Sequence, residues 1–70
     1  MTYAVEYSVD GGPLTKLVDG IPLEDTARHT AKRSLTVNKA HFARVINEDS
    51  GGEVWSVSLA DDGSFLESDG

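Results

Sequence analysis

Two histidines are the side chains of this chain best suited to acid–base or metal chemistry. Imidazole titrates near neutral pH and binds zinc, so His29 and His41 are candidate general bases or ligands. Zinc usually takes three or four protein ligands at tight spacing, and no third ligand is spaced close to either histidine. No cysteine is present to complete a site. We therefore expect ordinary surface histidines, with no metal site and no cofactor.

Serine and carboxylate groups offer two further kinds of chemistry. Ser50 precedes two glycines, but the Gly-x-Ser-x-Gly elbow of serine hydrolases is absent. Asp61 and Asp62 could act as paired carboxylates or calcium ligands, yet Gly63 follows them directly, which is typical of a hairpin turn. The acid that closes a calcium loop is missing at the required spacing. The sequence therefore predicts a protein that is not an enzyme.

The distribution of charge along the chain is the strongest pattern in the sequence. From Thr26 to Asn47 there are five basic residues and no acid. The segment before it holds five acids and one base, and the segment from Glu48 onward holds seven acids and no base, for a net charge of −6. Exposed charges of one sign add into a field that selects partners of the opposite sign. Two candidate binding surfaces follow from this pattern.

The first candidate surface is acidic and belongs to the C-terminal part of the chain. Its residues, the acidic loop set, are Glu48, Asp49, Glu53, Asp61 and Asp62. Their partner would be a basic protein surface, such as a groove that otherwise holds nucleic acid. Because Asp also favours turns, the same residues are typical of solvated hairpin loops. We expect the two loops to lie at opposite ends of the fourth strand.

The second candidate surface is the basic set, and it supports the alternative hypothesis of a nucleic-acid-associated module. Its residues are Arg28, Lys32, Arg33 and Arg44. Arg28 and Lys32 are one helical turn apart and share a face, where they could contact phosphate or an acidic protein. A solvated helix face whose charges match the helix dipole is the simpler explanation of these residues. Only Phe42 supplies an aromatic ring for stacking on bases, and the net negative charge opposes general binding to nucleic acid.

A small antiparallel sheet must position these side chains. Residues Tyr3, Val5 and Tyr7 alternate with small or polar residues, which predicts a half-buried strand. Turn residues then divide the chain into strands. The predicted strands are Thr2–Val9, Leu14–Val18, Ala40–Asn47 and Val54–Leu59, with Ser64–Leu66 as a short fifth strand at the edge. We expect the tail from Glu67 to Gly70 to be frayed.

One helix is predicted, from Leu23 to Leu35. Acids occupy its first turn, whereas Lys32 and Arg33 occupy its last turn, and both placements suit the helix dipole. A stripe of apolar and small residues recurs every four positions: Leu23, Ala27, Ala31 and Leu35. This stripe would let the helix lie close to the sheet, where we expect Trp55 to be buried in the core.

The order strand, strand, helix, strand, strand predicts an α+β fold with a four- to five-stranded antiparallel sheet and one helix packed on one face. We expect residues 1–70 to form a single small domain. One helix leaves the other sheet face bare, so that face must be polar, packed on a second copy as a homodimer, or used for a partner.

Composition limits the setting in which the chain works. No apolar run approaches the length of a membrane span, so we expect no membrane association. The N-terminal residues lack the basic and apolar regions of a signal peptide. The lack of cysteine fits a reducing compartment. The expected location is the cytoplasm.

The order of the predicted elements is also similar to that of a known group of proteins. Its elements here are the opening strand at Tyr3, the helix with Thr26-Ala27 and Ala31-Lys32, the strand around 43–46, the Trp55 strand, and Asp62-Gly63 before the last strand. In these elements the chain resembles the small phage-encoded anti-CRISPR proteins that inhibit type I CRISPR effector complexes. The resemblance covers most of the chain in outline and contains no specific motif.

The resemblance implies a non-enzymatic inhibitor that binds a Cas effector subunit and blocks the binding of target DNA or the recruitment of a nuclease. It also implies that the expected cytoplasm is that of a bacterial host. It implies no particular contact residues, and the basic middle of this chain departs from a pure DNA mimic. Our leading hypothesis is therefore a protein-binding inhibitor of phage or mobile-element type that uses the acidic loop set. The alternative is a small regulatory module that uses the basic helix.

Overall fold

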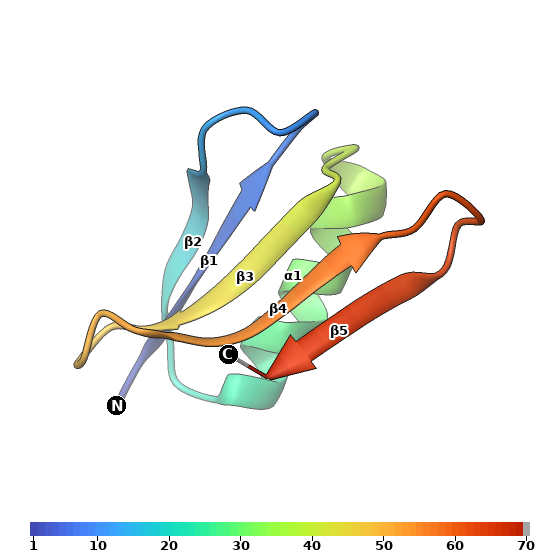
Figure 1. Ribbon diagram of the computed structural model, residues 1–70. Helices are drawn as coiled ribbons and strands as arrows, with labels where there is room; N and C mark the ends of the chain where they lie inside the picture. The colour runs from blue at the N-terminus through green and yellow to red at the C-terminus, as the bar shows by residue number, and fades with distance from the viewer. Residues whose placement is uncertain (70) are drawn as a thin grey trace.

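The computed structural model describes residues 1–69, which form five strands and one helix. The elements are β1 (Tyr3–Ser8), β2 (Thr15–Ile21), α1 (Glu24–Val37), β3 (Phe42–Asn47), β4 (Glu53–Leu59) and β5 (Phe65–Asp69). The strands form one antiparallel sheet in the order β2-β1-β3-β4-β5. Helix α1 packs on one face of this sheet (Figure 1). The predicted α+β class is therefore confirmed, and the fifth strand is present.

The pairing of β1 with β3 organises the sheet. These strands are separated in the chain by β2 and α1, yet they pair along the whole of β1, from Tyr3 opposite Asn47 to Ser8 opposite Phe42. The two predicted hairpins, β1 with β2 and β3 with β4, are both present, and the pairing of β1 with β3 joins them into one sheet. Because β1 comes from the acidic segment and β3 from the basic segment, the pairing brings opposite charges together.

The core lies between α1 and the sheet. Trp55 is 2% exposed, which confirms its predicted burial. The strands also contribute Val5, Val45 and Val57 to the core, and the helix contributes Ala27, Ala31 and Leu35. The two helix alanines are fully buried, so their small side chains let the helix lie close to the strands.

Helix α1 differs from the prediction at both ends. It continues to Val37, so Lys32 and Arg33 lie inside the helix and its last turn contains no base. The predicted match of these cations to the helix dipole is therefore wrong. The β-branched residues Thr36 and Val37 lower helix propensity, which is why the sequence indicated an earlier end. Leu23 is the N-cap and is 63% exposed, so it does not extend the buried stripe.

Strand β2 continues through Asp19 and Gly20, where the sequence predicted that it would stop. Two register shifts against β1 mark an irregular pairing, and Gly20 adopts a positive φ of 66°. This conformation, which glycine adopts readily, lets Ile21 return to the sheet opposite Tyr3 and enter the core. The Gly20 N–H donates to the Glu48 carboxylate at 2.8 Å. An irregular strand therefore contains a dipeptide that is typical of a turn.

Strand β5 is longer than predicted and replaces most of the expected frayed tail. It pairs with β4 from Phe65 opposite Leu59 to Asp69 opposite Trp55. The prediction of fraying is therefore wrong for Glu67–Asp69, because that segment pairs with β4 and contacts the helix. Gly70, the last residue of the predicted tail, lies outside the described residues.

Candidate functional site

The basic face of α1 is largely neutralised by the acidic C-terminal strand. The Lys32 Nζ atom lies 2.9 Å from the Glu67 carboxylate of β5, and the Arg28 guanidinium lies 3.7 Å from the Asp69 carboxylate. Arg28 also pairs with Glu24 one turn earlier in the helix. Two members of the basic set are therefore held by acids of the same chain.

Arg28 has a second structural contact. Its guanidinium carbon lies 5.5 Å from the centroid of the Trp55 ring, in the geometry of a cation–π interaction. The arginine thus covers the edge of the core between α1 and β4. A phosphate bound at Arg28 would have to compete with two carboxylates, which weakens the case for nucleic-acid binding here.

Arg44 lies on the other side of the sheet. Its neighbours in β3, Ala43 and Val45, are buried against the helix side, so Arg44 belongs to the open face. Its guanidinium contacts Glu6 at 2.7 Å and Glu53 at 3.7 Å. The basic set is therefore not one surface: the sheet separates Arg44 from Arg28, Lys32 and Arg33. Strand alternation causes this separation, which the linear charge pattern did not reveal.

Two bases keep their charge available. Among residues 1–69, Arg33 and Lys39 form no ion pair, and both are exposed. Arg33 lies on α1, whereas Lys39 follows the helix C-cap with a positive φ of 55°. Of the four residues in the basic set, Arg33 is thus the one without a carboxylate partner in the described chain.

The loop between β3 and β4 contains the first part of the acidic loop set. Glu48 accepts the Gly20 N–H, and its own N–H donates to the Thr2 carbonyl at 3.0 Å, so this residue joins the loop to β2 and to the residue that precedes β1. Asp49 is exposed and lies 3.9 Å from the N-terminal ammonium group of Met1. Glu53 begins β4 and faces Arg44. The loop is acidic, but Glu53 and Glu48 also have structural contacts.

The turn between β4 and β5 contains Asp61 and Asp62, at the opposite end of β4 from the first loop (Figure 1). Both residues are exposed. The Asp62 carboxylate accepts hydrogen bonds from the Ser64 hydroxyl at 2.6 Å and from the Ser64 N–H at 2.9 Å. These two bonds favour the ionised form and lower the pKa of Asp62 below its ordinary value of 3.8. The Asp62 carboxylate therefore stays ionised to a lower pH than an ordinary aspartate does.

The candidate catalytic and ligand groups do not assemble into a site in the part of the chain that the structure describes. His29 lies on α1, whereas the His41 ring accepts the Asp10 N–H at 3.1 Å near the end of the sheet. The Ser50 hydroxyl accepts the Gly52 N–H within its own loop. Within residues 1–69 no group of three or more His, Asp or Glu side chains could hold a metal ion.

The open face of the sheet is polar at its centre. Strand pairing places Glu6, Arg44 and Ser56 in one row across β1, β3 and β4. Ser8 and Ser56 are buried, and Phe42 and Ile46 are half-buried on the same face. The sequence left three possibilities for the face without a helix: a polar surface, a homodimer contact or a partner site. The first of them, a polar surface, describes the centre of this face.

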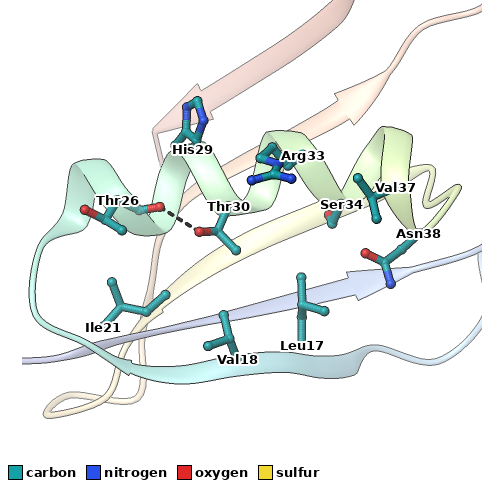
Figure 2. Close-up of a pocket in the computed structure, with 10 residues that line it drawn as sticks. All are labelled: Leu17, Val18, Ile21, Thr26, His29, Thr30, Arg33, Ser34, Val37 and Asn38. Carbon is teal, nitrogen blue, oxygen red and sulfur yellow. Dashed lines mark hydrogen bonds between the residues drawn. The ribbon is translucent and has the colours of Figure 1, made fainter.

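A groove between α1 and β2 is a feature that the sequence analysis did not predict. It has a volume of about 480 Å³ and is lined by apolar β2 residues and by one side of the helix (Figure 2). The sequence carried one signal for it: Leu17 and Val18 are adjacent apolar residues in a strand, whereas strict alternation would bury only one of them.

Comparison of the chain with protein-family models, with curated proteins and with solved structures finds no match. Within residues 1–69, no helix has the length and apolar character needed to cross a lipid bilayer.

Proposed function

We propose that this protein is a non-enzymatic protein-binding module whose acidic hairpin loops meet a basic surface of a partner protein. The observation that carries the proposal is that most basic side chains of the protein pair with acidic side chains of the same chain. Four of the six Lys and Arg residues pair with acids of the sheet and helix faces. The negative charge left over is therefore concentrated away from those faces, and much of it lies at the two loops.

The β4–β5 turn is the stronger of the two acidic sites. Asp61 and Asp62 form no ion pair within residues 1–69, and the Ser64 hydrogen bonds fix the Asp62 carboxylate in one orientation. A fixed, ionised carboxylate loses little conformational entropy when it binds a lysine or arginine. This turn is where we expect the largest effect of charge reversal.

The β3–β4 loop contributes through Glu48 and Asp49. Glu48 accepts the Gly20 N–H with one carboxylate oxygen, Asp49 lies near the Met1 ammonium group, and Glu53 faces Arg44. The two loops are separated by the seven residues of β4, which span about 20 Å at the usual rise of a strand. A partner must therefore be large enough to contact both ends, or it uses one loop alone.

The specific form of the proposal is the phage-type inhibitor that the outline resemblance implies, with a Cas effector subunit as its target. A groove that binds nucleic acid is basic, so carboxylates on a rigid hairpin are complementary to it. The alternative, a nucleic-acid-associated module, has less support from the geometry, because Arg28, Lys32 and Arg44 each contact a carboxylate.

Affinity capture tests the proposal. The immobilised protein is incubated with bacterial lysate that has or has not been treated with nuclease, and retained proteins are identified by mass spectrometry. We expect a basic subunit of a nucleic-acid-handling complex, and we expect the double variant Asp61→Lys/Asp62→Lys to weaken its affinity by at least about tenfold. Retention that disappears after nuclease treatment would contradict the proposal and favour the basic-helix alternative.

Matched variants separate a local effect from a change in net charge. Asp25→Lys reverses an exposed acid on α1 that forms no ion pair within residues 1–69, and Asp49→Lys tests the other loop. Glu48→Gln keeps an acceptor for the Gly20 N–H while removing the charge. If Asp25→Lys weakens binding as much as the single variant Asp61→Lys does, the loops have no special role and the proposal fails.

A further inference from the structure

The two flanks of α1 are built differently. The flank toward β5 is bridged by the ion pairs of Lys32 with Glu67 and of Arg28 with Asp69. The flank toward β2 contains no ion pair among the described residues and opens into the groove of about 480 Å³. Ion pairs therefore join the helix to β5 at one edge of the sheet, whereas a groove separates the helix from β2 at the other edge.

Apolar side chains line the inner part of this groove. Figure 2 shows Leu17, Val18 and Ile21 of β2 pointing toward the helix, with Thr30 and Val37 facing them from α1. Val37 is 67% exposed and Val18 is 37% exposed. Apolar surface in this arrangement would gain free energy from contact with another apolar chain.

The charge of the groove differs from that of the whole molecule. The chain has 12 acids and a net charge of −6, yet none of the carboxylates of residues 1–69 lines the groove. Arg33 is the one Lys or Arg in the lining, and it forms no ion pair within residues 1–69. The side of the groove formed by α1 therefore presents an uncompensated positive charge next to apolar side chains.

Strand β2 forms the outer edge of the sheet beside this groove. It pairs with β1 alone, so its other side presents main-chain N–H and C=O groups to solvent. Register shifts between Lys16 and Val18 and between Val18 and Ile21 interrupt the pairing of β2 with β1. The extra residue at Leu17 lets Leu17 and Val18 both point toward the helix, while the outer edge of the strand stays unpaired. An added strand would lie about 4.8 Å from β2, with every second side chain directed to the helix side.

We propose that the edge of β2 and the adjoining groove bind an extended segment of a partner protein by strand addition. On the groove side, the segment carries apolar side chains against Leu17 and Val18 and a carboxylate that meets Arg33. Main-chain bonds to β2 give affinity, and the alternate side chains give specificity. This surface is separate from the acidic loops, so the inference does not depend on the proposed function.

A second copy of the chain is less suitable as the occupant. Pairing of β2 with β2 would place two identical grooves together, each with its own Arg33 and without a carboxylate in its lining. The charges in the two linings would then repel each other, whereas an acidic segment would neutralise Arg33. The charge of the lining therefore favours a different chain as the partner.

Titration of the isotope-labelled full chain with synthetic peptides, followed by NMR, tests the inference. The probe is an extended peptide, Thr-Val-Thr-Val-Thr-Glu-Thr, compared with versions that have Gln or Lys in place of Glu. We expect the Glu peptide to bind tightest and to shift amide signals of β2 and of the groove side of α1. Methylation of its main-chain nitrogens should abolish binding, since strand addition needs these donors.

A pair of variants isolates the role of Arg33. Arg33→Glu should weaken binding of the Glu peptide about fivefold and leave the Gln peptide nearly unchanged. Lys39→Glu reverses another exposed base outside the groove and should change neither by more than about twofold. Equal effects of both variants would overturn the role of Arg33.

Three results would overturn the inference as a whole. The first is the absence of any shift in β2 and α1 with all three peptides. The second is preference for the Lys peptide. The third is a dimer in sedimentation analysis that Val18→Asp dissociates, since a second copy would then occupy the β2 edge. Loss of partner binding by the acidic-loop variants, with peptide binding retained, would show that the two surfaces act separately.

Discussion

The Lys32 ammonium group lies 2.9 Å from the Glu67 carboxylate, and this contact joins the basic helix to the acidic C-terminal strand. The same relationship recurs on the other sheet face, where Arg44 of the basic segment contacts Glu6 of the first acidic segment. The blocks of charge along the chain thus become neighbours of opposite sign in the fold. Much of the linear charge pattern stabilises the fold, and only the remainder is available to a partner.

Exchange of the charges at Lys32 and Glu67 tests this contact. Each single variant, Lys32→Glu or Glu67→Lys, should lower the free energy of unfolding by about 0.5–1 kcal/mol because it places like charges together. The double variant should recover most of that loss. Urea denaturation at low and high salt measures the effect, which should shrink at high salt. Simple additivity of the two single effects would contradict the contact.

Arg44→Gln should destabilise the fold more than removal of an exposed charge that forms no ion pair does. Glu6 has a side chain 23% exposed and would lose its contact with the Arg44 guanidinium. We expect a loss of about 1–2 kcal/mol in the free energy of unfolding, measured by urea denaturation. Arg33→Gln provides the matched control and should change stability by less than about 0.5 kcal/mol. Equal stability of the two variants would argue against a structural role for Arg44.

Local patterns in the sequence predicted the fold class well. Period-two alternation located β1 and β4, and acids at Glu24 and Asp25 marked the start of the helix. The errors came where long-range contacts override local preference. Asp19-Gly20 is typical of a turn, but a contact with Glu48 and the return of Ile21 to the core keep it in β2. The C-terminal tail contains few apolar residues, yet it pairs with β4.

The candidate surfaces were harder to predict than the fold. The contact between Glu6 and Arg44 depends on the pairing of β1 with β3, across 38 positions of sequence, and no local pattern specifies that pairing. The groove depends on where α1 lies over the sheet, which is closer to β1 and β3 than to β2. Both properties arise from tertiary packing and not from the order of residue types.

Ala31→Leu should destabilise the fold by crowding the interface of the helix with the sheet. Ala31 has no exposed surface, so a larger side chain would push α1 away from the strands. Overpacking of this kind costs about 1–3 kcal/mol in the free energy of unfolding, measured by thermal or urea denaturation. Thr36→Leu adds a similar side chain at an exposed position of the same helix and should have little effect. Unchanged stability in Ala31→Leu would contradict the close approach.

Acid should weaken the β4–β5 turn through Asp62. Hydrogen bonds from Ser64 lower the pKa of Asp62 in the folded protein below 3.8, whereas the unfolded chain has the ordinary value. A carboxyl group of this kind stabilises the fold above pH 3.8, and its contribution disappears as the pH falls through the lower, folded pKa. Carbon-13 NMR titration of the Asp62 carboxyl group should therefore give a midpoint below 3.8.

Ser64→Ala removes the shorter of the two bonds and should raise the pKa of Asp62 toward its ordinary value. The variant should also lose part of the change in stability that the native chain shows below pH 3.8, because the folded and unfolded pKa values then differ less. Ser50→Ala makes the same substitution in the β3–β4 loop and should leave the Asp62 titration unchanged. If Ser64→Ala leaves the Asp62 midpoint where it was, the hydrogen bonds do not control the charge of this turn.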